Sequence, residues 1–231
     1  NVTESAGTLS GSAQIASDVS GSFNKGFSVS NTVGPENSTR VTSSFLLDGT
    51  ADYFNLYSYP AGTTVTVSAW TKGYGGWYIV GGHPGNNIWF LGYLNGGGGN
   101  TATFRYDNGG SQIIINGSTV ISDNQWHHLV GVTTPTAGYM YVDGVLDGTT
   151  VTGGNWSGNV ISLGKQAGSS SNFFSGSIGE VSIWNTDLSA AAVKQIYNGG
   201  HPLDSTINTG NYSQSSSLQM YLSPISASHD G

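Results

Sequence analysis

The chain has 231 residues, of which 36 are glycine and only 8% are charged, against about a quarter in ordinary soluble domains. Its formal net charge is −7 and its six basic residues are scattered, which argues against nucleic-acid binding and basic-patch membrane binding. The chain has no cysteine and no apolar run near the roughly 20 residues that span a bilayer, so we expect neither disulfides nor membrane insertion.

Residues 1–40 are rich in Ser, Asn and Gly, and we expect an N-terminal arm with a first strand near 8–16, then a loop that carries Asp18. Short segments of alternating apolar and polar residues follow from residue 41 onward, separated by turn-forming residues. Strands are predicted at 44–47, 53–57, 64–71, 77–81, 87–93, 101–106, 111–115, 127–133, 139–142, 160–163 and 177–184. Many strands with Gly-rich turns predict an all-β sandwich or barrel.

One stretch, residues 189–198, has the pattern of a helix. Ser189 is a suitable N-cap, and Asn198 followed by glycine is a suitable stop. Leu188, Ala192 and Ile196 are spaced by four, so we expect them to face the sandwich. The sequence predicts a helix that packs on the sheets.

Two further signals concern chain reversals and the C-terminal part. Asp143-Gly144 predicts a tight hairpin turn, because this pair tolerates positive φ angles. The tail at 204–231 contains one more strand-like piece, 218–223. It either returns to the sandwich or begins a following domain.

Three ordered segments resemble one family. Residues 45–54 read FLLDGTADYF and residues 67–72 read VSAWTK. The third segment starts at 124–132 (NQWHHLVGV) and continues through 140–144 and 174–200. Together they resemble the laminin-G-like jelly-roll family of concanavalin A-like lectins and glucanases, of the sort found in bacterial, phage and viral surface proteins.

The resemblance implies a two-sheet antiparallel jelly-roll sandwich over residues 41–203, between the arm at 1–40 and the C-terminal arm or return strand at 204–231. Strand aromatics then fill the space between the sheets, and we expect Trp70, Trp126 and Trp184 in the core. Adjacent strand residues point to opposite faces, so His127 and His128 are not expected to ligate one metal together.

Laminarinase-type glycoside hydrolases share this broader fold and use a Glu-x-Asp-x-x-Glu strand, whose paired carboxylates cleave glycosidic bonds. The nearest match here begins at Glu180, but Ser182 and Asn185 replace the other two acids. We therefore expect no enzymatic activity.

Pentraxins, also related in fold, bind calcium with an acidic loop, but Lys165 and Ala167 stand where acids would be expected. We expect any calcium at a different site, with Asp18 and Glu180 as candidate ligands, because calcium takes carboxylate and carbonyl oxygens. The alternative is a loop-ordering aspartate and a hydrogen-bonded glutamate.

Aromatic residues among Gly and polar neighbours are candidate glycan platforms, because loop residues often carry binding. The candidates are Tyr74, Trp77, Trp89 and Trp156. Ordinary packing is the alternative for each.

Two hypotheses for the function stand close together. The first is a surface binding module that recognises glycans or a surface receptor. The second is a structural or assembly domain of a virion or surface filament, with arms that pair with a neighbour's sheet edge or self-associate. Both place the chain outside the cell, on a cell surface or on a virion surface.

Overall fold

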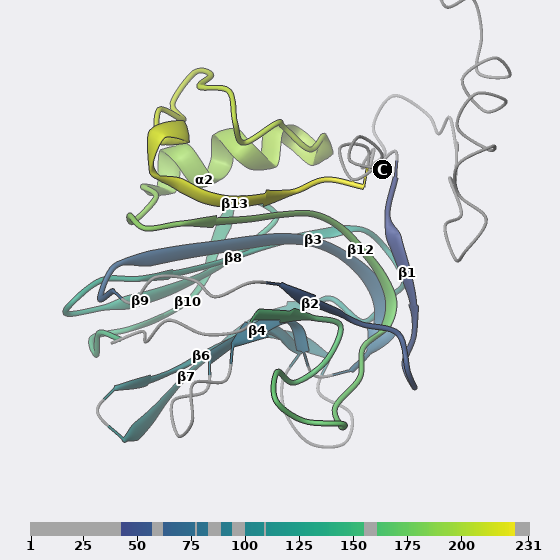
Figure 1. Cartoon of the computed structure of the whole chain (residues 1–231). Coiled ribbons are helices and arrows are strands. Elements are labelled where there is room, and N and C mark those ends of the chain that lie inside the picture. Colours follow the sequence, from purple (N-terminus) through teal and green to yellow (C-terminus); the bar gives the residue numbers. More distant parts are fainter. Residues whose placement is uncertain are drawn as a thin grey trace, which may run out of the picture.

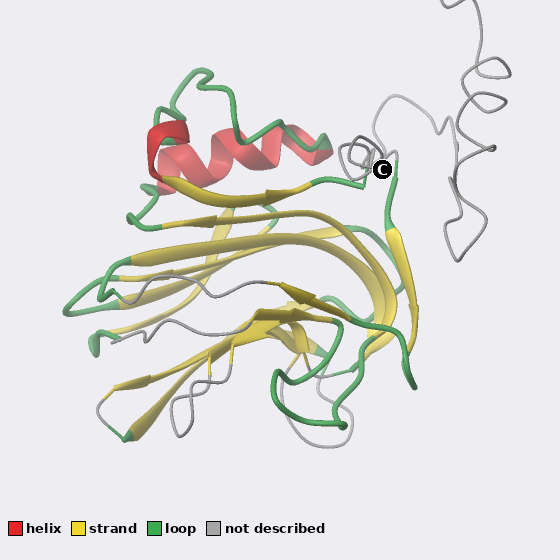
Figure 2. Cartoon of the chain, viewed as in Figure 1, coloured by secondary structure: helices red, strands yellow, loops and turns green. Residues whose placement is uncertain are grey.

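The computed structural model describes residues 43–56, 62–76, 78–82, 89–93, 100–108, 110–154 and 161–224. Within these residues, two antiparallel sheets pack face to face and one α-helix lies on the outer side of one sheet (Figures 1 and 2). The predicted all-β sandwich with one short helix is confirmed. The strand predicted near 8–16 lies outside the described residues.

The larger sheet has seven strands, and neighbouring strands are hydrogen-bonded. Its order is β1 (Phe45–Asp48), β12 (Ser175–Trp184), β3 (Val65–Gly75), β8 (His127–Thr133), β9 (Gly138–Val142) and β10 (Val145–Thr150), with β13 (Leu218–Leu222) paired to β12. The six-stranded sheet has the order β2 (Phe54–Leu56), β11 (Ile161–Leu163), β4 (Tyr78–Gly82), β5 (Trp89–Tyr93), β6 (Thr101–Asn108) and β7 (Ser111–Val120).

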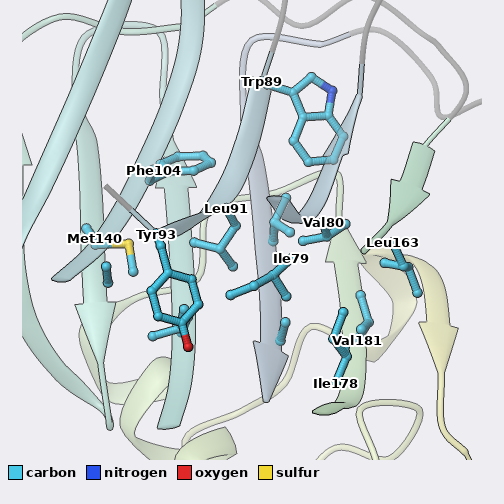
Figure 3. Close-up of a cluster of buried hydrophobic side chains, with 14 of the residues drawn as sticks. Ile79, Val80, Trp89, Leu91, Tyr93, Phe104, Met140, Leu163, Ile178 and Val181 are labelled. Carbon is cyan, nitrogen blue, oxygen red and sulfur yellow. The ribbon is translucent and has the colours of Figure 1, made fainter. Parts of the chain in front are cut away.

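The main core lies between the two sheets, where alternate residues of each strand meet. Leu91 and Phe104 of the six-stranded sheet are fully buried in the same cluster as Met140 and Val181 of the larger sheet (Figure 3). The period-two pattern of the sequence therefore reports which face of each strand is inside.

Two of the three tryptophans that were predicted to fill the space between the sheets are buried in another place. Trp70 and Trp184 are buried, but on the outer face of the seven-stranded sheet, where Trp70 stacks on His128 and Tyr197. Their strands turn Ala69 and Ile183 toward the other sheet instead. Trp126 stands just before β8 and is only partly buried, so its placement in the core was wrong.

The helix α2 (Ala190–Tyr197) covers part of this outer face (Figure 1). The Ser189 hydroxyl accepts a hydrogen bond from the backbone N–H of Ala192 at 3.2 Å, and Asn198 ends the helix with a φ of 50°. Leu188, Ala192 and Ile196 are buried, as the spacing predicts. Two 3₁₀ turns, Asn198–Gly200 and Ser215–Ser217, follow.

The predicted hairpin turn is confirmed, with φ angles of 50° at Asp143 and 76° at Gly144. It joins β9 to β10, a strand that the sequence did not predict. The register of β10 shifts between Leu146 and Gly148, and this irregularity breaks the alternation on which the prediction depended.

The C-terminal piece returns to the sandwich, because β13 pairs antiparallel with β12. The segment before it also packs there, since the Nε1–H of Trp184 donates to the hydroxyl of the buried Tyr212 at 2.8 Å. Among the described residues, no helix is both long enough and apolar enough to cross a membrane.

Candidate functional site

The structure separates the predicted glycan-contacting residues. Tyr74, near the end of β3, is 75% exposed, whereas Trp89, at the start of β5, is 4% exposed. Figure 3 shows Trp89 among the buried side chains of the core. Trp89 is thus a packing residue and not an exposed platform. Trp77 and Trp156 lie outside the described residues.

Three segments meet at Ser175, at one end of the seven-stranded sheet. Ser175, the first residue of β12, pairs with Asp48 of β1 on one side and with Gly75 of β3 on the other. The turn after Asp48 leads to Tyr53, and the loop before Ser175 contains Phe173. The β11–β12 loop lies at the lower edge of the sandwich in Figure 1.

A bulge exposes Tyr74. Gly75 pairs with Ser175 and Gly73 pairs with Gly176, which leaves Tyr74 as an extra residue between the two pairs. A bulge residue leaves the regular alternation of the strand, so its side chain is re-aimed. The ring of Tyr74 consequently stands in solvent although its strand is central in the sheet.

The turn before Tyr53 is fixed by one carboxylate. Oδ1 of Asp48 accepts hydrogen bonds from the backbone N–H groups of Thr50, Ala51 and Asp52, at 2.7, 2.9 and 3.1 Å. These bonds, led by that from Ala51, hold the pKa of Asp48 far below its ordinary value. Asp48 therefore shapes the turn through its ionised carboxylate.

Lys165 lies beneath this turn. Its Nζ atom is 3.5 Å from the centre of the Tyr53 ring, a cation–π contact, and the residue is only 8% exposed. The ring of Phe173 packs on the same tyrosine, with 6.3 Å between ring centres. Within the described residues, Lys165 has no carboxylate within 4.0 Å.

We call Tyr53, Tyr74, Phe173 and Lys165 the aromatic rim. Tyr53 is 43% exposed and Tyr74 is 75% exposed, and the Lys165 ammonium group, which carries three N–H donors, lies against the Tyr53 ring. Sequence reasoning found Tyr74 but missed the other three. Tyr53 was visible only as part of a family motif, and Lys165 only as a departure from an acidic loop.

Gly76 allows the β3–β4 connection to approach the rim. Its φ is 124°, and a Cβ atom there would lie 2.9 Å from the Cα of Phe174. Phe174 is fully buried against Tyr93, so it cannot move aside easily. The glycine thus holds the end of β3 against the residues that carry Phe173.

The calcium candidate Glu180 lies on β12, while Asp18 lies outside the described residues. Oε1 of Glu180 accepts a hydrogen bond from the Ser223 hydroxyl at 2.9 Å, and Oε2 is buried without a partner. Burial raises the pKa of this carboxyl, although hydrogen bonds from Tyr221 and Ser223 oppose the shift. Among the described residues, no group of three His, Asp or Glu side chains is arranged to hold a metal ion.

The adjacent residues His127 and His128 contact different partners, because neighbouring residues of a strand point to opposite faces of the sheet. His127 lies between Asp143 (Nδ1 to Oδ2, 2.8 Å) and Asp123 (Nε2 to Oδ1, 3.1 Å). His128 contacts the Ser68 hydroxyl at 2.7 Å and stacks on Trp70. Both imidazoles are buried, so they serve the packing of β8 and not an open site.

A family model described as the concanavalin A-like lectin/glucanases superfamily matches residues 48–194. No curated protein sequence matches the chain.

Solved structures share the fold. Domain 4 of AbnA, an extracellular arabinanase of Geobacillus stearothermophilus, in complex with arabinotriose, is 18% identical, with a TM-score of 0.57 over 74% of this chain and 80% of that one. A heptameric SAP-like pentraxin of Limulus polyphemus is 16% identical, with a TM-score of 0.51 over 66% and 80%. The binding domain of botulinum neurotoxin DC, in complex with SialylT, is 17% identical, with a TM-score of 0.54 over 74% and 44%. At these identities the likeness establishes the fold.

Proposed function

Because this chain belongs to the concanavalin A-like lectin/glucanases superfamily, we propose that it is a non-catalytic binding module that recognises glycans through the aromatic rim. The observations that carry the proposal are two exposed tyrosines: Tyr74, 75% exposed at the bulge near the end of β3, and Tyr53, 43% exposed with Lys165 against its ring.

The rim combines the two kinds of contact that a sugar needs. A sugar ring has an apolar face of C–H groups, which packs on aromatic faces such as those of Tyr53 and Tyr74. Its hydroxyls need hydrogen-bond partners, and Lys165 is a donor held in place by the Tyr53 ring. Because Phe173 and the Asp48 turn already fix Tyr53, little side-chain entropy is lost on binding.

The acids that a retaining glycosidase would need on β12 are replaced. Ser182 is buried and donates a hydrogen bond to Ser205 at 2.9 Å, while Glu180 is occupied by Ser223. Both contacts belong to the packing of the C-terminal segment on the outer face of the sheet. This arrangement supports binding without catalysis, in the extracellular setting of the neighbouring binding domains.

A glycan array with the purified full chain tests the proposal. We expect specific binding by the wild type, and loss of most of that signal in Tyr74→Ala. Val151→Ala is the matched control, because Val151 is 93% exposed and lies outside the rim. An empty array from a chain that unfolds cooperatively would overturn the glycan proposal for the sugars printed.

The same array, repeated with EDTA, tests calcium. Binding that disappears with EDTA and returns with added calcium supports a structural ion, for which Asp18 and Glu180 remain the proposed ligands. Binding that is indifferent to EDTA, together with an unchanged melting temperature, contradicts it.

A further inference from the structure

The loop at 121–126, between β7 and β8, borders the bulge at the end of β3. In the described part of the sheet, β8 pairs with β3 only as far as Thr71. Beyond that point the loop takes the place of a strand, because the backbone N–H of Asn124 donates to the carbonyl of Gly73 at 3.3 Å. Gly73 directly precedes the exposed Tyr74, so the loop holds the backbone next to this tyrosine.

His127, the first residue of β8, is held between two carboxylates and ties this loop to the β9–β10 turn. Its Nδ1 lies 2.8 Å from Oδ2 of Asp143, and its Nε2 lies 3.1 Å from Oδ1 of Asp123, in the loop. A neutral imidazole carries a proton on only one nitrogen, whereas an imidazolium donates from both. Two carboxylates that face the two nitrogens therefore select the imidazolium form of His127.

Loss of one proton from His127 would break the contact with Asp123. The carboxylate of Asp143 is anchored to β8, because its Oδ1 also accepts the backbone N–H of His128 at 2.8 Å. It also makes the shorter of the two contacts, so a neutral imidazole keeps its proton on Nδ1. The lone pair of Nε2 then faces an oxygen of Asp123, and two acceptors repel each other. The side chain of Asp123 is 44% exposed, so water can take the place of His127.

The other titratable groups on the elements around His127 do not replace these contacts. Among the described residues they are Lys72 of β3, Tyr93 of β5, His128 of β8 and Tyr197 of α2. Lys72 has no described carboxylate within 4.0 Å. Burial lowers the pKa of His128 to about 4 and raises the pKa of Tyr93 to about 12. Burial also raises the pKa of Tyr197. His127 is therefore the group among these neighbours that loses its charge just above neutral pH.

We propose that the His127 imidazolium clamps the loop at 121–126 against Gly73, which fixes the end of β3 that carries Tyr74, and that deprotonation releases the loop and weakens glycan binding at the aromatic rim. The effect on binding rests on the proposed function. A binding residue that is fixed before the ligand arrives loses less conformational entropy on binding. The coupling is reciprocal, so a bound glycan also favours the protonated clamp.

The direction of the pH effect follows from the contacts of His127. Burial opposes its charge, but the hydrogen bonds to Asp143 and Asp123 hold its pKa above the ordinary value near 6.5. The clamp is therefore closed at pH 6 and open at pH 9. Binding should be stronger on the acid side of this change.

Electron paramagnetic resonance of a nitroxide label at position 74 tests the clamp without any glycan. Tyr74→Cys provides a unique attachment site, because the natural chain has no cysteine and the position is 75% exposed. We expect a label of restricted mobility at pH 6 that becomes more mobile at pH 9. Identical spectra at the two pH values overturn the proposal.

Asp123→Asn, added to the labelled chain, separates the clamp from a general effect of pH. The amide oxygen accepts a hydrogen bond from an imidazolium, and the amide N–H donates one to a neutral imidazole. The label should therefore stay restricted at both pH values. His201→Gln is the matched control at an exposed position and should respond to pH like the labelled parent. A pH response that persists in Asp123→Asn contradicts the clamp.

Glycan arrays at pH 6 and pH 9 test the effect on binding with Tyr74 in place. For the wild type we expect a signal about fivefold lower at pH 9, the low end of typical coupling between two sites. Asp123→Asn should bind equally at both pH values. Equal binding by the wild type at both pH values overturns the regulation. An empty array together with a pH-responsive label rejects the glycan function and supports the clamp.

Discussion

Nδ1 of His127 lies 2.8 Å from Oδ2 of Asp143, and the other oxygen of that carboxylate accepts the backbone N–H of His128, also at 2.8 Å. One carboxylate at the β9–β10 turn thus holds the start of β8. Burial opposes a charge on His127, but Asp143 and Asp123 outweigh it and hold the pKa of His127 above its ordinary value.

This pair predicts a loss of stability at alkaline pH. The folded pKa of His127 is raised, so its contribution is complete below the ordinary pKa near 6.5 and disappears as pH rises through the folded value. Asp143→Asn should cost about 1–2 kcal/mol at pH 6 and remove most of this dependence. Urea unfolding from pH 5 to 9 measures this pH dependence of the unfolding free energy. Parallel pH–stability curves for wild type and variant would contradict the prediction.

His128 should have the opposite effect on the pH dependence of stability, a loss of stability at acid pH. Burial lowers its pKa to about 4, so its neutral form stabilises the fold above pH 6.5, and this stability is lost as pH falls toward 4. His128→Gln should flatten the acid side of the pH–stability curve while leaving the alkaline side unchanged. If the acid side of the variant falls as steeply as that of the wild type, other groups control acid unfolding.

Truncation of the exposed rim residue Tyr74 and truncation of the buried Phe174 should have different effects on stability. Tyr74→Ala should change the unfolding free energy by no more than about 0.5 kcal/mol, because the ring is mostly in solvent. Phe174→Ala, one residue beyond the rim, should cost about 3–5 kcal/mol, because it opens a cavity beside Tyr93. Thermal melts of both variants separate a binding residue from a packing residue. Equal losses would mean that Tyr74 is part of the packing.

Gly76 provides a test of the close approach at the end of β3. Gly76→Ala should cost more than Gly110→Ala, although both glycines have positive φ, at 124° and 97°. Nothing lies within 4 Å of a Cβ at Gly110, so that variant measures backbone strain alone, about 1–3 kcal/mol. The difference between the two unfolding free energies reports the clash with Phe174, and a difference of zero would mean that the loop relaxes freely.

The sequence predicted the strands and the helix well, because both depend on local patterns. Alternation marked the inner faces of most strands, and Ser189 and Asn198 bounded the helix. The site was predicted less well. Trp89 follows a stretch with glycine and asparagine at 85–87, yet its strand turns the ring into the core.

The expectation that Tyr74 is exposed was correct. The reason for its exposure is a bulge that depends on the pairing of β3 with β12. The contact of Lys165 with Tyr53 joins residues 112 positions apart. No local pattern predicts such a contact, because Tyr53 precedes β2 and Lys165 follows β11, and these two strands meet only when they pair in the six-stranded sheet.

Asp147 predicts a further pH effect, at the corner where the two sheets meet. Burial alone would raise the pKa of Asp147, but hydrogen bonds from Thr119 and Ser118 lower it. The carboxylate therefore contributes stability above its ordinary pKa, and this contribution is lost as pH falls through the lower folded value. Asp147→Asn should cost about 1 kcal/mol at pH 7, since the site is partly open to solvent. The difference from wild type should shrink in unfolding measurements below about pH 4. Asp187→Asn, at an exposed position, is the control, and an equal loss in both variants would refute a specific role for the link between β10 and β7.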